Sequence, residues 1–247
     1  MTPYYSADGI TVYHARFEDV LAAGLVPTDV ALIHADGPYG VNERTDRASK
    51  GRSRAFGSAN ALPRAGRRTA ARDFPPVAGD DQPFDPAPLL ALSRPTVLWG
   101  ANHYAPRVPG SPSWITWDKK CDTTPDDNAD CEHAWSNLGG PARIFRHLWR
   151  GSIRASEVGP AIHLHPTQKP IALSAYVFQR AKLKRGDLVF VPFLGSGPDL
   201  PAARAMGLRV IGCDVEEWCC RTAVARLGAA PHPEPVASLG PLFGGAS

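Results

Sequence analysis

The sequence predicts an α/β protein with a doubly wound, mostly parallel sheet of the Rossmann-like type. Segments with the pattern of strands alternate with segments that have the pattern of helices, and this alternation is typical of parallel sheets. Residues 30–35 form a short, mostly apolar run, as expected for a strand that is buried on both faces. A polar motif follows that run directly, and ligands bind at this end of the strands in open α/β sheets.

The elements can be placed in chain order from apolar periodicity and from helix and turn signals. In the first part of the chain we expect a short helix that ends at Gly24, at residues 17–23, and strands at 10–14, 30–35, 96–99 and 114–117. Residues 132–138 and 143–148 have the pattern of a strand and a short helix, or of a hairpin. In the last part we expect strands at 187–191 and 210–212 and helices at 170–182, 198–206 and 216–227. Pro170 suits a helix start, and Gly207 and Gly228 suit helix ends.

Length and composition favour one domain rather than two. The 247 residues suffice for one well-buried α/β domain, which we expect to span residues 1–228. Residues 42–88 lack periodicity and are rich in Arg, Gly, Ser and Pro, so we expect a mobile basic loop there and a loose tail over 229–247. Between residues 42 and 72, nine basic residues stand against two acidic ones. This charge suggests a polyanionic partner, although a solvated loop without a partner would show the same pattern.

Other features bear on compartment and metal binding. The chain has no apolar run long enough to span a membrane and no apolar segment of a signal peptide near its start, so we expect a cytoplasmic protein without a membrane partner. The five cysteines are an odd number without paired spacing, which is typical of reduced thiols. Cys121, Cys131 and His133 could contribute to a zinc site, but no second Cys-x-x-Cys pair would complete it. We therefore expect no metal.

A glycine-rich turn between two predicted strands points to a nucleotide-like ligand. Gly195-Ser196-Gly197 follows the strand at 187–191, and Asp214 ends the next strand. The glycines let the backbone approach a ligand, the following helix offers free N–H groups, and the carboxylate can accept hydrogen bonds from ribose hydroxyls. A plain strand–helix–strand crossover with a tight turn is the alternative interpretation.

The motif Asp36-Gly37-Pro38-Tyr39 follows the apolar run at 30–35. The Asp36 carboxylate and the Gly37 carbonyl could accept the two hydrogens of an exocyclic amino group. Pro38 would fix the backbone so that both acceptors converge, and Tyr39 could stack on an extruded base. An ordinary β-turn is the alternative, because Asp, Gly and Pro are all turn residues.

With the peptide His165-Pro166-Thr167-Gln168-Lys169-Pro170, these motifs resemble a known family. The chain is similar to the β-class amino-methyltransferases of DNA, and it has their permuted order, with the base motif first and HPTQKP and PFLGSG near the C-terminus. The stretches WGANHYA at 99–105 and WITWDK at 114–119 are similar to the small phage-type branch of that family. The resemblance covers residues 10–227.

The resemblance implies a Rossmann-like DNA methyltransferase, of the kind found in restriction–modification, that moves a methyl group from S-adenosylmethionine to adenine N6 or cytosine N4. Because the motif begins with Asp, adenine is favoured. The implied contacts to the methionine end of the cofactor come from His165, Thr167, Gln168 and Lys169. The implied cofactor cradle consists of Phe193, Gly195, Ser196 and Gly197, with Asp214 at the ribose. The flipped base would be held by Asp36, Gly37, Pro38 and Tyr39. The phosphates of double-stranded DNA would be contacted by Arg44, Arg47, Lys50, Arg52 and Arg54. A homodimer is plausible by the same resemblance.

Three positions depart from the family pattern. Gly37 replaces a proline, which keeps the carbonyl acceptor but makes it more flexible. Val191 replaces an acid that meets the ammonium group of the cofactor, and Asp199, close by in sequence, could compensate. Arg16 replaces an acid near the adenine. Because losing one charged hydrogen bond costs about 1.5–3 kcal/mol, a catalytically weak or inactive methyltransferase-like protein, which binds DNA or supports a partner subunit, is the main alternative. An RNA or small-molecule methyltransferase is a further one, and the long basic loop argues against a small substrate.

Overall fold

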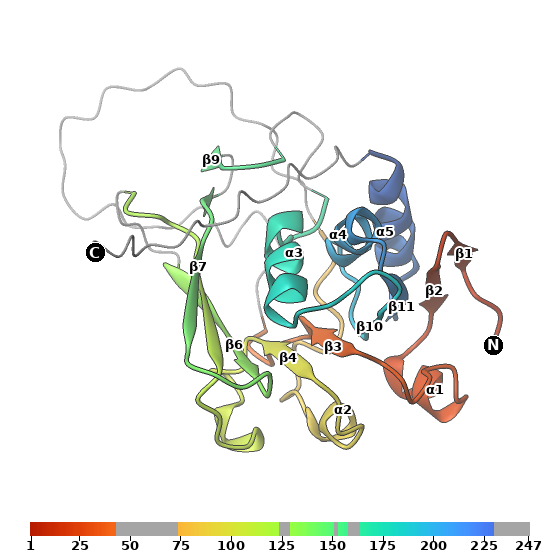
Figure 1. Ribbon diagram of the computed structural model, residues 1–247. Helices are drawn as coiled ribbons and strands as arrows, with labels where there is room; N and C mark the ends of the chain where they lie inside the picture. Colours follow the sequence, from red (N-terminus) through yellow and green to blue (C-terminus); the bar gives the residue numbers. More distant parts are fainter. Residues whose placement is uncertain (43–73, 124–128, 151–152, 158–163, 230–247) are drawn as a thin grey trace, which may run out of the picture.

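The computed structural model describes residues 1–42, 74–123, 129–150, 153–157 and 164–229 (Figure 1). Its main sheet has nine strands in the order β1-β2-β11-β10-β3-β4-β6-β5-β7. The strands are β1 (Tyr5–Ala7), β2 (Ile10–His14), β3 (Leu32–Ala35), β4 (Thr96–Trp99), β5 (Trp114–Asp118), β6 (Cys131–Ser136), β7 (Arg143–Arg146), β10 (Leu188–Val191) and β11 (Arg209–Asp214). A separate pair is formed by β8 (Trp149–Arg150) and β9 (Ile153–Arg154).

Parallel pairing dominates the centre of the main sheet. The run β2–β11–β10–β3–β4 is parallel throughout. Antiparallel pairs occur where β1 joins β2 and where β6 lies between β4 and β5. The predicted mostly parallel sheet is therefore confirmed.

Helices cover both faces of the sheet. On one face, α3 (Ile171–Arg180), α4 (Asp199–Met206) and α5 (Glu217–Ala229) lie beside one another, while α1 (Phe17–Ala22) and α2 (Ala87–Leu90) lie on the opposite side (Figure 1). A single 3-10 turn, η1 (Ala105–Arg107), follows β4 among the described residues. Two hydrophobic clusters, one on each face, match this division, since the first includes residues of α3 to α5 and the second residues of α1 and α2.

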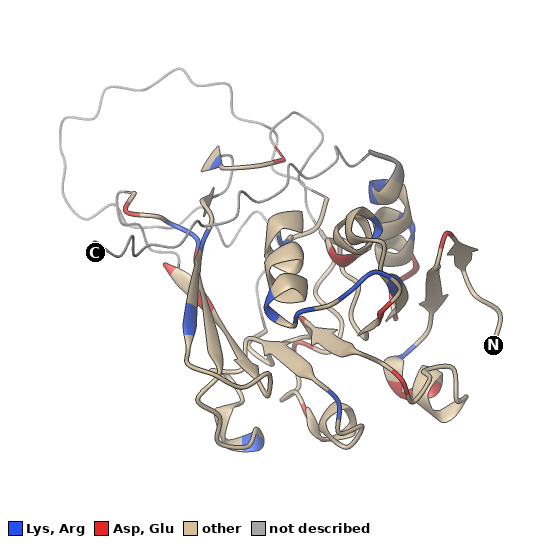
Figure 2. Cartoon of the chain, viewed as in Figure 1, with Lys and Arg blue, Asp and Glu red and all other residues tan. Residues whose placement is uncertain are grey.

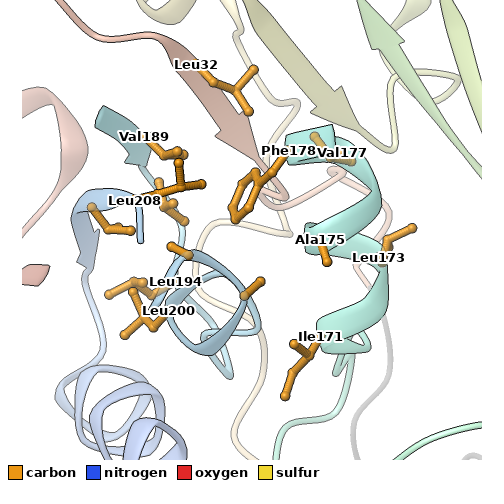
Figure 3. Close-up of a cluster of buried hydrophobic side chains, with 14 of the residues drawn as sticks. Leu32, Ile171, Leu173, Ala175, Val177, Phe178, Val189, Leu194, Leu200 and Leu208 are labelled. Carbon is orange, nitrogen blue, oxygen red and sulfur yellow. The ribbon is translucent and has the colours of Figure 1, made fainter. Parts of the chain in front are cut away.

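The larger cluster fixes α3 and α4 against the central strands. Phe178 of α3 points toward α4 and the strands, where Leu32 of β3 and Val189 of β10 lie (Figure 3). Leu200, in the first turn of α4, is fully buried in the same cluster. Full burial of one large apolar side chain contributes about 1.5–3 kcal/mol, so this packing holds the start of α4 firmly at the end of β10.

Most predicted elements are confirmed to within two residues at each end. The helix predicted at 216–227 continues through Gly228 to Ala229, so Gly228 lies inside the helix rather than just after its end. Residues 143–146 form a strand that pairs in parallel with β5, so neither a helix nor a hairpin with β6 is correct. The prediction missed β1, β8 and β9. These strands are short and lack an apolar run, so they can be recognised only from the strand with which each one pairs.

The expected basic loop can be compared only in part. Residues 74–86 carry no helix or strand, and α2 begins at Ala87 within the predicted loop. Residues 43–73 and 230–247 lie outside the described residues. None of the described helices is long and apolar enough to cross a membrane.

Candidate active site

The carboxyl ends of β3, β10 and β11 open onto one cavity of about 1460 Å³. These strands are parallel neighbours, so motifs that are far apart in the chain meet there. Every residue predicted to contact the base or the cofactor lines the cavity, except Gly197. Ligand pockets usually have volumes of about 300–1,000 Å³, so this one has room for a nucleotide-like cofactor together with a base.

The glycine-rich turn lies between β10 and α4. Gly195 and Gly197 have φ angles of +50° and +64°, a left-handed conformation that favours glycine. A Cβ at Gly197 would lie 2.4 Å from the Cβ of Ala223, so the close packing of α5 requires a glycine there. Gly197 therefore lets the turn pack against α5, whereas Gly195 and Ser196 line the cavity.

Asp214 stands at the end of β11, beside this turn. Its carboxylate accepts hydrogen bonds from the N–H groups of Gly195, at 2.8 Å, and Glu216, at 2.9 Å. Burial raises the pKa of Asp214 above its usual value, although these hydrogen bonds oppose the shift. The carboxylate thus orders the turn and also faces the cavity, which is the position expected for a ribose contact.

Two buried hydrogen-bond donors on the cavity wall lack a partner among the described residues. The Oε1 atom of Gln168 accepts the N–H of Leu164 at 2.8 Å, which leaves the Nε2 group of Gln168 as the donor without a partner. Trp218 stacks on His165 with ring centroids 5.1 Å apart, and its Nε1 group also has no partner. Because buried polar groups are nearly always hydrogen-bonded, these donors indicate that a ligand with acceptor atoms belongs here.

Lys169 connects the HPTQKP peptide to the base motif. Its Nζ atom lies 2.8 Å from Asp36 Oδ2, 3.1 Å from Glu132 Oε2 and 3.2 Å from Tyr39 Oη. Burial alone would lower the pKa of Lys169, but the carboxylates of Asp36 and Glu132 outweigh it and raise the pKa. The amino group is therefore a buried ammonium that faces Asp36 of the base motif.

Glu132 on β6 is a site residue that the sequence did not indicate. It accepts hydrogen bonds from Lys119, at 2.9 Å, and from Lys169. Burial alone would raise the pKa of Glu132, but the two lysines outweigh it and lower the pKa to about 2. Glu132 reaches the site because β6 pairs with both β4 and β5, and no local motif records that pairing.

Tyr39 is positioned by its hydroxyl group and by the space around its ring. The hydroxyl donates to Asp36 Oδ1 at 2.7 Å, and burial together with the charge of Asp36 raises the pKa of Tyr39 well above its usual value. The ring stacks on His103 at 5.4 Å between centroids. A Cβ at Gly100 would lie 2.1 Å from the ring, so Tyr39 can occupy this place only because residue 100 is a glycine.

Gly37 is held by close packing. A Cβ at this position would lie 2.8 Å from the ring of Phe193. Phe193 itself packs edge-on against Phe17 and Phe84, with ring centroids 5.3 and 5.6 Å apart. The expectation that glycine makes this segment looser is therefore corrected, because an aromatic cluster fills the space that a larger residue would need.

The other two departures from the family pattern have different surroundings. Val191 is 1% exposed and belongs to the apolar cluster with Leu194 and Leu200, and it does not line the cavity. Arg16 is exposed at the rim of the cavity, where it forms an ion pair with Glu18 at 3.3 Å. An acid at position 191 would thus face apolar side chains rather than a ligand.

The predicted DNA contacts Arg44, Arg47, Lys50, Arg52 and Arg54 lie outside the described residues. Within the described part, Lys and Arg positions are scattered over several elements with acidic positions between them (Figure 2). Some of the basic side chains line the cavity beside the base motif, namely Lys119, Lys120, Arg150 and Arg154.

Fold and site together define a Rossmann-like α/β protein of the methyltransferase type, with a glycine-rich turn and an Asp-led motif at one cavity. Residues 112–225 match the family model N6_N4_Mtase, described as DNA methylase. The matched region contains Glu132, the HPTQKP peptide, the glycine-rich turn and Asp214. The resemblance to the DNA amino-methyltransferases is thus confirmed.

Individual relatives support the same class. The chain is 37% identical over 88 residues to the Type II methyltransferase M2.DpnII of Streptococcus pneumoniae, which is 34% of this chain and 31% of that protein. It is 34% identical over 87 residues to the Type II methyltransferase M2.LlaDCHI of Lactococcus lactis subsp. cremoris, which is 34% of this chain and 30% of that protein. The matches thus span less than a third of either relative. The structure of the PvuII DNA methyltransferase (cytosine-N4-specific) shares the fold with a TM-score of 0.53 at 11% identity, over 90% of this chain and 87% of that one.

Proposed function

We propose that this protein transfers a methyl group from S-adenosylmethionine to an exocyclic amino group in double-stranded DNA, with adenine N6 preferred over cytosine N4. The observation that carries the proposal is the shared cavity. Asp36, fixed by Lys169 and Tyr39, and the glycine-rich turn with Asp214 line the same space. A cavity that combines an ordered acceptor with a nucleotide cradle suits transfer between a cofactor and a base.

The residues present fit this cofactor. Asp214 can accept hydrogen bonds from the ribose hydroxyls, and Gly195 lets the backbone approach. The unpartnered donors of Gln168 and Trp218 match a ligand that carries a carboxylate and ring nitrogens. The cofactor, when bound, supplies an electrophilic methyl group, so the chemistry needs no metal.

The protein's part in the reaction is to orient and stabilise. Lys169 and Tyr39 hold the Asp36 carboxylate by direct contacts, so Asp36 can act as a hydrogen-bond acceptor for the amino group. The Gly37 carbonyl can accept the second hydrogen. Both acceptors favour the positive charge that develops on the amino nitrogen during transfer, and their fixed geometry lowers the barrier further.

The base must leave the duplex to reach Asp36, at a cost of a few kcal/mol. Adenine is preferred because the motif begins with Asp, and the basic segment at 42–72 supports a nucleic acid rather than a small substrate. We infer that the protein acts in the cytoplasm as a homodimer, through one domain over residues 1–228.

The test separates transfer from cofactor binding. The Asp36→Ala variant should lose methyl transfer to double-stranded DNA while it still binds S-adenosylmethionine in calorimetric titration. Asp29→Ala is the matched control, since Asp29 is an exposed acid that pairs with Arg209 at 3.6 Å, away from the cavity. Full activity in Asp36→Ala would rule out the assigned role. Equal transfer to a matched RNA oligonucleotide would replace the DNA assignment with RNA.

A further inference from the structure

Asp199 is a buried acid on the cavity wall whose side chain contacts a histidine rather than a lysine or arginine of the described residues. It is the first residue of α4, it is 5% exposed, and it lines the same cavity as Asp36 and Asp214. Its Oδ1 atom lies 2.6 Å from His34 Nδ1 on β3. Burying an ionised carboxylate is costly unless it is paired, so the state of His34 decides how well Asp199 is compensated.

The hydrogen-bond network shows that His34 is neutral. The indole Nε1 group of Trp99 lies 2.9 Å from His34 Nε2, and an indole can only donate. The Nε2 atom must therefore accept, and the single ring proton sits on Nδ1, where it is donated to Asp199. The contact is thus a hydrogen bond from the imidazole Nδ1–H to the carboxyl group of Asp199, and not an ion pair with an imidazolium.

Four other acids on this wall have partners among the described residues. Asp36 and Glu132 share Lys169, and Asp214 accepts two backbone N–H groups. Asp80 accepts the N–H groups of Tyr39, Gly40 and Val41. Asp199 has no lysine or arginine within ion-pair distance in the part of the chain that the structure describes. The start of α4 offers only about half a positive charge, so a cationic ligand is what this carboxylate lacks.

We propose that Asp199, positioned by His34, binds the ammonium group at the methionine end of the cofactor. The inference rests on the proposed function, because it takes S-adenosylmethionine as the ligand. The side chain at position 191 faces the apolar cluster. Asp199 lies on the cavity wall eight residues later, after the glycine-rich turn that joins β10 to α4. In this protein the acid therefore stands at the start of α4 rather than at the end of β10, and His34 and Trp99 hold it in place.

The test compares two ligands that differ in the amino-acid group. S-adenosylhomocysteine carries the ammonium group without the sulfonium charge, and 5′-methylthioadenosine lacks both. In calorimetric titration, Asp199→Asn should weaken S-adenosylhomocysteine binding by about 10- to 100-fold, as expected for one charged hydrogen bond, and leave 5′-methylthioadenosine binding unchanged. The asparagine can still accept the His34 proton, and unchanged 5′-methylthioadenosine binding would itself show an intact cavity.

Each other outcome overturns the inference in a distinguishable way. Equal weakening of both ligands would make Asp199 a structural residue of α4 only. Weakening of S-adenosylmethionine but not of S-adenosylhomocysteine would assign the carboxylate to the sulfonium group. Unchanged binding of all three would refute the contact while leaving the proposed function intact. A wild-type protein that binds none of them would refute the proposed function and, with it, this inference.

Discussion

Replacing Glu132 with glutamine tests the buried charge network beside the base motif. The pKa of Glu132 lies at about 2, against a usual value of 4.5, because Lys169 and Lys119 outweigh the effect of burial. A pKa lowered by this amount is worth about 3 kcal/mol of folding stability, since one pKa unit corresponds to about 1.4 kcal/mol. Glu132→Gln should therefore lower the free energy of unfolding at pH 7 by about 3 kcal/mol.

The pH dependence gives this prediction a distinctive signature. A lowered folded-state pKa contributes stability that is complete above the unfolded pKa and is lost as the pH falls through the folded pKa. The difference between wild type and Glu132→Gln should thus be constant above about pH 5.5 and fall to less than half by about pH 3. Urea unfolding followed by circular dichroism between pH 7 and pH 3 measures it.

A matched control and a refuting result follow from the same reasoning. Glu18 also pairs with a basic side chain, that of Arg16, but the Glu18 side chain is 42% exposed, so Glu18→Gln should change the unfolding free energy little at any pH. A loss below about 1 kcal/mol for Glu132→Gln at pH 7, or a loss that does not vary with pH, would refute the network as described.

Three further substitutions probe the packing of the site. Gly37→Pro restores the family motif, yet it should lower the melting temperature, because the ring of Phe193 lies 2.8 Å from the new Cβ position. Adding Phe193→Leu to the same chain should recover part of the loss. An unchanged melting temperature in Gly37→Pro would contradict the packing argument. Gly100→Ala should abolish methyl transfer by displacing Tyr39 while S-adenosylmethionine binding persists in titration, and an active variant would show that Tyr39 is not confined as described. Val191→Asp should lower the unfolding free energy by at least about 3 kcal/mol, because it places a charge in an apolar cluster. The loss should exceed that of Val191→Ala. A gain in cofactor affinity instead would place position 191 at the ligand.

The sheet and the three motifs were predictable because their signals are local. The apolar run before Asp36 and the strand before Gly195 are continuous in sequence, and their helices carry clear ends such as Gly207. Parallel order then requires the motifs to meet at one edge of the sheet. The glycine-rich turn and Asp214 are also adjacent in space for the reason expected from the sequence.

The charge network was not predictable, because it depends on pairing between distant segments. Glu132 reaches Lys169 only through the position of β6 in the sheet, and His34 reaches Asp199 across two parallel strands and a turn. The amino group of Lys169 turns toward Asp36, and no local pattern sets that direction.

Family comparison could not show the surroundings of two substituted positions. It identified Gly37 and Val191 as altered, but it could not show which neighbour fills the space at each position. At Gly37 the neighbour is the ring of Phe193, and at Val191 it is an apolar cluster. The physical meaning of each substitution therefore became clear only from the packing around it.

The central claim is methyl transfer to an exocyclic amino group of DNA. The most direct measurement incubates the protein with methyl-labelled S-adenosylmethionine and unmethylated double-stranded DNA, digests the DNA, and identifies the labelled nucleoside by mass spectrometry. We expect labelled N6-methyldeoxyadenosine that is absent with Asp36→Ala. Cofactor binding without any label in DNA, or label on a ring carbon of cytosine, would contradict it.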